Sequence, residues 1–125
     1  MAKYFSTEFF QELVTRLVKD PDWLKGAAKV TTKLMMTVTD RGESTILDVQ
    51  ASQVTVRAAK PDDPADFKFE APYEVWLRVA KERKDIQSLV LQGKIKFRGP
   101  LAKFMPMQPA LVRMEAVARD MPAEF

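Results

Sequence analysis

The chain has 125 residues, 46% of them hydrophobic and 30% charged, which is typical of a single globular domain. It contains no cysteine and no histidine, which excludes disulfides, thiolate or imidazole metal sites and serine–histidine catalysis. A formal net charge of +3 is too small to predict a nucleic-acid-binding surface, although it is compatible with transient contact with an anionic membrane surface.

The first predicted element is an amphipathic helix over residues 5–19, because apolar residues recur there at the spacing of one helical face. Ser6 is its expected N-cap, and Phe5 and Phe10 are spaced to form a hydrophobic staple across the cap. Asp20 is the expected cap of a second, short helix.

Alternation of period two begins near residue 31 and predicts three antiparallel strands with one apolar side. A loop rich in proline and aspartate follows at residues 58–66. A fourth strand then carries Phe67 and Phe69 to the same apolar side.

The second half of the chain returns to helices, with one strand between them. An amphipathic helix is predicted over residues 72–83, and Asp85 caps another short one. Gly93 ends that helix before a fifth strand at residues 94–98, and a last helix runs to about Asp120. This order predicts an α+β fold in which a five-stranded, mainly antiparallel sheet has helices packed on one face.

The segment after the fifth strand is unusually apolar. Its large apolar residues fall at helical spacing, and its methionines adapt to irregular apolar shapes. Such a surface either closes a core or lines a lipid pocket, and the pattern alone does not decide between the two. These residues are Leu101, Phe104, Met105, Met107, Leu111 and Met114.

Three stretches resemble the sterol carrier protein type 2 family over nearly the whole chain. They are ADF at residues 65–67, APYEVW at 71–76 and GKIKFRGPL at 93–101, the last being the most specific. Pro100 stands where the family usually has an aspartate; proline suits the first turn of a helix but supplies no carboxylate cap.

The resemblance implies a sheet and helices that enclose an apolar tunnel, with no catalytic residue, metal or cofactor. We expect Trp76 near the tunnel mouth, because a buried indole N–H needs a partner. The candidate tunnel residues are Trp76, Leu89, Phe97, Leu101, Phe104, Met105, Met107, Leu111 and Met114.

The implied function is non-enzymatic binding and transfer of a lipid, whether fatty acid, acyl-CoA, sterol or phospholipid, by a monomer or a homodimer. An alternative is an interaction or dimerisation module that docks onto a partner enzyme, with its cavity filled by side chains. A lipid-ester hydrolase based on lysine or carboxylate is the third alternative. The family's peroxisomal members end in a targeting tripeptide that this chain lacks, and no secretory signal is recognisable, so a cytoplasmic location is expected.

Two charged clusters have simpler interpretations than a binding site. Asp62, Asp63 and Asp66 lack the spacing of a calcium loop, so turn chemistry is the better interpretation. A solvated sheet face is favoured for the basic residues Lys94, Lys96, Arg98 and Lys103, because alternation places the neighbouring aromatic on the opposite face.

Overall fold

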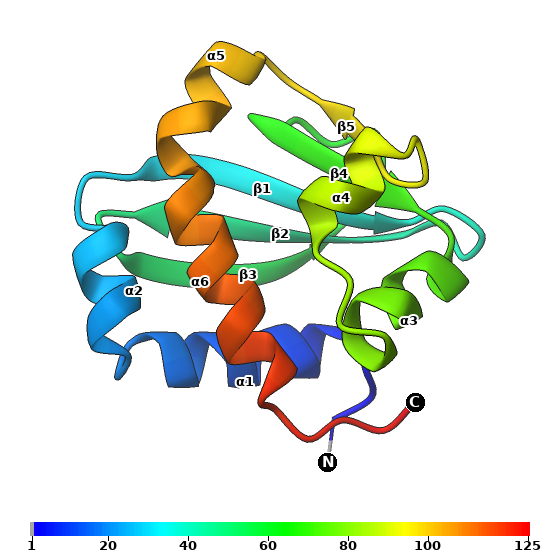
Figure 1. The fold of residues 1–125 in the computed structure, drawn as a ribbon, viewed down its shortest axis with the longest axis horizontal. Helices are drawn as coiled ribbons and strands as arrows, with labels where there is room; N and C mark the ends of the chain where they lie inside the picture. The colour runs from blue at the N-terminus through cyan, green and yellow to red at the C-terminus, as the bar shows by residue number, and fades with distance from the viewer. Residues whose placement is uncertain (1) are drawn as a thin grey trace.

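The computed structural model describes residues 2–125, and Figure 1 shows its fold. One five-stranded sheet carries the helices on one of its faces, which confirms the predicted α+β architecture. In chain order the elements are α1 (Thr7–Leu17), α2 (Pro21–Gly26), β1 (Thr31–Val38), β2 (Glu43–Gln50), β3 (Gln53–Ala59), β4 (Phe67–Ala71), α3 (Tyr73–Lys81), α4 (Ile86–Leu91), β5 (Lys96–Arg98), α5 (Leu101–Phe104), the 3-10 turn η1 (Met105–Met107) and α6 (Gln108–Arg119).

The starts of the first two helices follow from local chemistry. Ser6 accepts a hydrogen bond from the backbone N–H of Phe9 at 3.2 Å, so it caps α1 as predicted. The ring centroids of Phe5 and Phe10 lie 4.9 Å apart, which confirms the predicted staple. Asp20 caps α2 by accepting a backbone N–H bond at 2.8 Å. Each cap contributes about 1 kcal/mol to helix stability.

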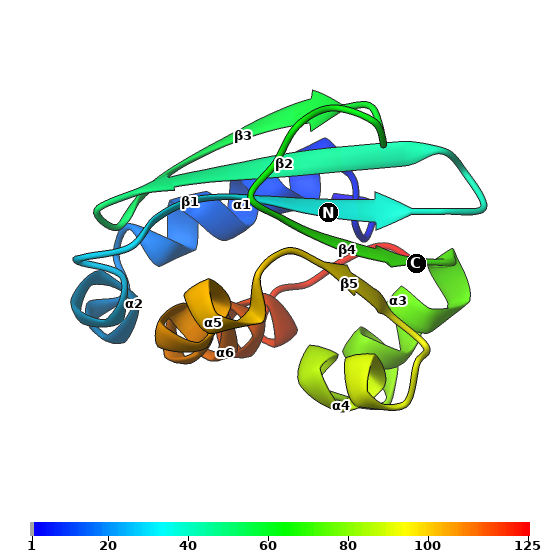
Figure 2. The same ribbon diagram turned by 90° about the horizontal axis from the view of Figure 1, so that it is seen from above.

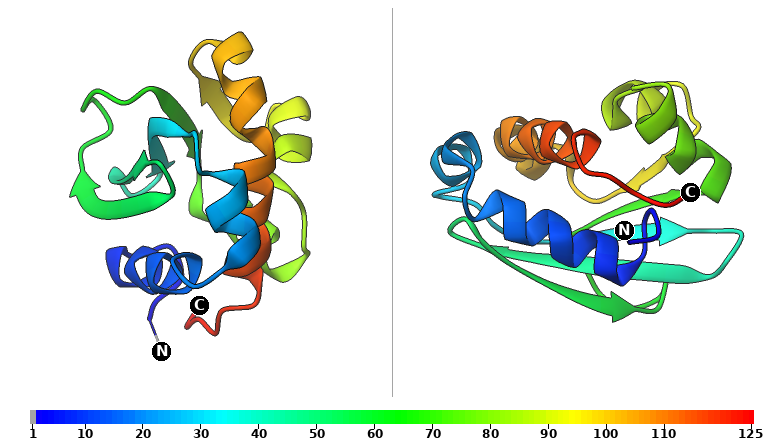
Figure 3. Two further views of the ribbon diagram at one scale, coloured as in Figure 1. Left: turned by 90° about the vertical axis from the view of Figure 1, so that its left-hand side faces the viewer. Right: turned by 90° about the horizontal axis from the view of Figure 1, so that it is seen from below.

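The strand order in the sheet is β3-β2-β1-β4-β5. The pairs β1–β2, β2–β3 and β4–β5 are antiparallel, while β1 and β4 are parallel. The prediction of a mainly antiparallel sheet is therefore confirmed, with one parallel pair that makes the sheet mixed. To reach β4 from β3, residues 60–66 cross the face of the sheet opposite α6, as Figures 2 and 3 show.

That crossing covers a second apolar patch which the sequence did not predict. Met35 and Ile46 are paired across β1 and β2, alternate with the core-facing residues, and are fully buried. The expectation of a single apolar side for these strands is thus wrong. The crossing segment accounts for the burial, and Asp66 anchors it by accepting from the backbone N–H of Lys33 at 2.8 Å.

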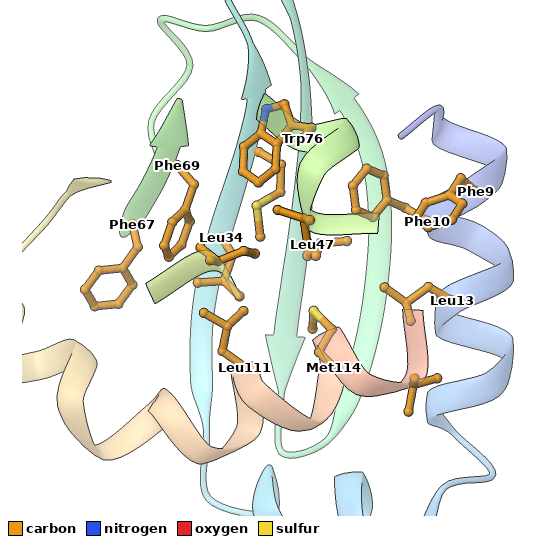
Figure 4. Packing of buried hydrophobic residues seen from close by; sticks show 14 of the residues in the cluster. Phe9, Phe10, Leu13, Leu34, Leu47, Phe67, Phe69, Trp76, Leu111 and Met114 are labelled. Atoms are coloured by element: carbon orange, nitrogen blue, oxygen red, sulfur yellow. The ribbon is translucent and has the colours of Figure 1, made fainter. Parts of the chain in front are cut away.

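The main core lies between the sheet and the helices. Figure 4 shows Leu34 and Leu47 of the sheet, Leu13 of α1, and Leu111 and Met114 of α6 gathered in this space. Full burial of each such side chain stabilises the fold by roughly 1.5–3 kcal/mol. The core therefore fixes α6 above the middle of the sheet, where the candidate site lies.

Trp76 ties α3 to the sheet and to the N-terminal segment. Its side chain is fully buried, and its indole N–H donates to the carbonyl oxygen of Thr37 at 2.9 Å. The expectation that the indole lies near a tunnel mouth is therefore wrong, because a strand carbonyl satisfies it deep in the core. The Phe5 ring stacks on Trp76 with centroids 4.5 Å apart, and the Tyr4 hydroxyl donates to the Trp76 carbonyl oxygen at 2.7 Å.

The two ends of the chain lie side by side (Figure 1). Lys3 and Glu124 form a parallel bridge, and the backbone N–H of Tyr4 donates to the Glu124 carbonyl oxygen at 2.8 Å. None of the helices in residues 2–125 is both long and apolar enough to span a membrane.

Candidate functional site

Two apolar cavities lie between the sheet and the helices. The inner cavity, of about 50 Å³, is bounded by the N-terminal segment, α1, β1, α3 and α6. The outer cavity, of about 180 Å³, is bounded by β4, α4, β5, α5, η1 and α6. Ile86, Leu111 and Glu115 line both cavities and form the partition between them. The two cavities therefore adjoin at these three side chains.

Helix α6 supplies the partition because its spacing places Leu111, Met114 and Glu115 on one face. Figure 4 shows Leu111 and Met114 turned toward the sheet. Pro106 and Pro109 divide the preceding chain into α5, η1 and α6, so it bends around the outer cavity instead of continuing straight.

Three phenylalanine rings form one wall of the outer cavity. The ring centroid of Phe97 lies 5.2 Å from that of Phe69 and 5.1 Å from that of Phe104, and the centroids of Phe69 and Phe104 lie 5.8 Å apart. The tilted and edge-to-face geometries are those that aromatic quadrupoles prefer. The wall is therefore apolar, and its rings are packed in favourable geometries.

Exposed apolar side chains gather around this outer cavity. Leu91 is 81% exposed, Leu101 61%, Val112 54% and Met105 52%, and all four line the cavity. They are four of the seven large apolar side chains that are exposed among the described residues. We call these four residues the apolar rim. Contiguous exposed apolar surface of this kind marks ligand or interaction sites.

Glu115 is the one charged side chain that is buried in the described part of the chain, with 8% exposure. Burial raises the pKa of Glu115 to about 7, against the opposing effects of a hydrogen bond from the Ile86 backbone and the charge of Arg119. Its Oε2 lies 3.6 Å from Nη2 of Arg119. That nitrogen also donates to the Lys84 carbonyl oxygen at 2.9 Å, while Nε of Arg119 is buried without a hydrogen-bond partner.

The sequence interpretation missed Glu115 and Arg119. A signal was present, because Glu115 follows Leu111 by four positions and so falls on the apolar face of the last helix. A charge at that position is the local inconsistency that often marks a functional residue.

The structure distributes the predicted tunnel residues between the two cavities and the core. Leu89 is fully buried in the core and lines neither cavity. Met107 lies outside both, beside Trp23 and Met114. Trp76 and Met114 line the inner cavity, Phe97, Leu101, Phe104 and Met105 line the outer cavity, and Leu111 lines both.

In the aspartate-rich loop, the carboxylates accept hydrogen bonds from backbone N–H groups and so stabilise the turns, as the sequence predicts. Asp63 accepts from the backbone N–H of Lys60 at 2.9 Å, and Asp66 holds the N–H of Lys33. Residues 2–125 contain no cluster of three or more acidic, histidine or cysteine side chains that could hold a metal ion.

Comparisons with known proteins agree with this architecture. A family model described as the SCP-2 sterol transfer family matches residues 10–112. A crystal structure of sterol carrier protein 2 is 22% identical with a TM-score of 0.84, and the match covers 96% of this chain and 100% of that chain. A solution structure of a conserved hypothetical protein from Thermus thermophilus is 20% identical with a TM-score of 0.83, covering 99% and 93% of the two chains. Among curated proteins, none matches this chain.

A more distant match is the UbiJ-SCP2 ubiquinone synthesis protein, with 21% identity, a TM-score of 0.62, and coverage of 90% of this chain and 89% of that one. At these identities the solved structures show a shared fold, while the family model spans most of the sequence. The chain therefore belongs to the SCP-2 sterol transfer family, and its class of function is lipid binding or transfer.

Proposed function

We propose that this protein is a carrier that holds one single-chain lipid in the two cavities and performs no chemistry on it. The observation that carries the proposal is the apolar wall that runs from the inner cavity, past Ile86 and Leu111, to the apolar rim. Burial of a hydrocarbon chain along this wall supplies the binding free energy, at roughly 25 cal/mol per Å² of apolar surface.

Binding a long chain requires the partition to move. Each cavity is smaller than the roughly 300–1,000 Å³ of typical small-molecule sites. Rotation of Ile86 and Leu111 to other rotamers joins the two cavities and makes room for the chain. Apolar side chains adapt in this way at modest cost when a ligand replaces the contacts they lose.

We further propose that lipid is exchanged at an anionic bilayer surface through the apolar rim. Lys103 lies in α5 between the rim residues Leu101 and Met105, and it is exposed. An exposed lysine among exposed apolar side chains suits a surface of acyl chains and anionic headgroups.

A cavity-filling substitution tests the carrier proposal. Val90 is half-buried and lines the outer cavity, so Val90→Phe fills that cavity with a larger side chain. Val14→Phe is the matched control, because Val14 is also half-buried but lines neither cavity. Binding of the fluorescent fatty acid cis-parinaric acid is measured for both variants, with thermal unfolding as the check on folding.

We expect Val90→Phe to weaken probe binding by about tenfold or more while its Tm stays near that of the wild type, since the cavity has room for the ring. Val14→Phe leaves binding unchanged. Equal binding by Val90→Phe and wild type would contradict the proposal. Absence of probe binding together with concentration-dependent dimerisation would favour a docking module instead.

A further inference from the structure

The inner cavity contains polar groups that a purely apolar ligand does not use. Glu115 and Arg119 lie on one face of α6, and both line this otherwise apolar space. The neighbouring Tyr4 hydroxyl already donates to the Trp76 carbonyl oxygen at 2.7 Å, and burial raises the pKa of Tyr4, so it stays neutral. The unused hydrogen-bonding capacity of the cavity therefore belongs to Glu115 and Arg119.

Arg119 has a donor that lacks an acceptor. Its Nη2 donates to the Lys84 carbonyl oxygen at 2.9 Å, whereas its Nε is buried and has no partner. Buried donors without acceptors are rare in folded proteins because they have lost their hydration without replacement. A ligand that brings an oxygen to this point satisfies the donor.

Glu115 has acceptor capacity to spare. The 3.6 Å between its Oε2 and Nη2 of Arg119 is an ion-pair distance, longer than a good hydrogen bond. Because the side chain is only 8% exposed, water has little access to its remaining lone pairs. A ligand that brings an O–H or N–H donor gains a charge-assisted hydrogen bond here.

We propose that Glu115 and Arg119 form a polar subsite at the inner end of the cavities that receives the hydroxyl head of a single-chain lipid alcohol. The hydroxyl oxygen accepts a hydrogen bond from the N–H at Nε of Arg119. The hydroxyl O–H donates a hydrogen bond to the Glu115 carboxylate. This inference rests on the carrier function and adds the head-group chemistry and the orientation of the ligand.

Other head groups fit the pair less well. A hydrocarbon end leaves Nε of Arg119 without a partner. A carboxylate satisfies that nitrogen but places a second negative charge beside Glu115. A single neutral hydroxyl meets both groups at once, so the pair selects for it.

The orientation that follows is head inward and tail toward the rim. Arg119 lines the inner cavity but not the outer one, whereas the exposed Leu91 and Leu101 line the outer cavity. A lipid leaving a bilayer presents its head to a docked protein first, so it enters in this orientation without turning.

The test compares 1-decanol with 1-chlorodecane, which has the same chain but no hydroxyl. Binding is followed by tryptophan fluorescence, since Trp76 lines the inner cavity. The variants are Arg119→Met, which removes the donor but keeps an unbranched side chain, and the control Arg78→Met. Arg78 forms an exposed ion pair with Glu82 at 3.7 Å and lines neither cavity.

We expect wild type and Arg78→Met to bind 1-decanol about tenfold more tightly than 1-chlorodecane. Arg119→Met should lose this preference while its affinity for 1-chlorodecane stays the same. If wild type binds both compounds equally, or if Arg119→Met keeps the preference, the subsite is overturned but the carrier function stands. If neither compound binds to wild type, the carrier function itself fails, and the subsite fails with it.

Discussion

Arg113 of α6 binds both carboxylate oxygens of Asp20, the residue that caps α2. Its Nε donates to Oδ1 at 3.0 Å and its Nη2 to Oδ2 at 2.5 Å. The bidentate pair joins residues 93 positions apart in the chain and attaches α6 to the N-terminal helices. It therefore helps to hold the helix that separates the two cavities.

The contribution of the Arg113–Asp20 pair to folding stability should depend on pH. The hydrogen bond from Arg113, followed by that from the Trp23 backbone, lowers the pKa of Asp20 from 3.8 to about 2. A carboxyl whose pKa is lower in the folded protein stabilises the fold above its unfolded pKa, and this stabilisation is lost as the pH falls through the folded pKa. Arg113→Met should lower Tm at pH 7 by about 2–4 °C, and the difference should shrink below pH 3. A constant difference from pH 7 to pH 2 would argue against the pairing.

The contribution of Glu115 to folding stability should have the opposite pH dependence. Burial raises its pKa from 4.5 to about 7, so the folded protein binds more protons than the unfolded chain between these values. The stability contributed by neutral Glu115 is present below about pH 4.5 and is lost as the pH rises through 7. Glu115→Gln should be no more stable than wild type at pH 4.5 and more stable at pH 8, by on the order of 2–3 kcal/mol. Urea unfolding at both pH values measures this, and parallel pH profiles would contradict it.

Binding of a lipid acid should be linked to the protonation of Glu115. The charged or titratable groups around that carboxyl are Arg119 of α6, Asp85 before α4 and Tyr4 of the N-terminal segment. Decanoate adds a negative charge to this cluster, so we expect Glu115 to take up a proton on binding. Wild type should bind decanoate about five- to tenfold more tightly at pH 6 than at pH 8. Titration of Glu115→Gln should show almost no difference, and a difference as large as that of wild type would place the proton elsewhere.

The apolar rim should govern membrane contact without affecting folding. Leu91 is 81% exposed, so Leu91→Asp should leave Tm unchanged. It should reduce co-sedimentation with phosphatidylserine-containing vesicles several-fold, because it replaces an apolar contact with a repelled charge. Leu24→Asp is the matched control, since Leu24 is 39% exposed on α2 and lines neither cavity. Equal loss in both variants would mean that net charge alone controls the binding.

Local features could be predicted from the sequence because they depend on neighbouring residues. Ser6, Asp20 and Asp85 each cap the helix that the sequence assigned to them. Gly93 ends α4 with a positive φ of 74°, a conformation that glycine adopts without strain. The role of each of these residues can be predicted from the few residues on either side of it.

Features that depend on distant packing were missed. The parallel pairing of β1 with β4 follows from a crossover that no local pattern reveals. The family resemblance made Leu89 a candidate tunnel residue, but its apolar character could not separate a cavity wall from the core, because both are apolar. The raised pKa of Glu115 comes first from burial, and this burial depends on how α6 packs against elements far away in the chain, so the sequence alone could not predict it.

Native mass spectrometry of freshly purified protein decides whether the protein carries a lipid, when it is followed by solvent extraction and identification of any lipid that accompanies the protein. The carrier account predicts a near-stoichiometric single-chain lipid, which the Val90→Phe protein has lost and the Val14→Phe protein retains. A measured mass equal to that of the protein alone, together with no uptake of added single-chain lipids, would contradict the proposal that the protein is a lipid carrier.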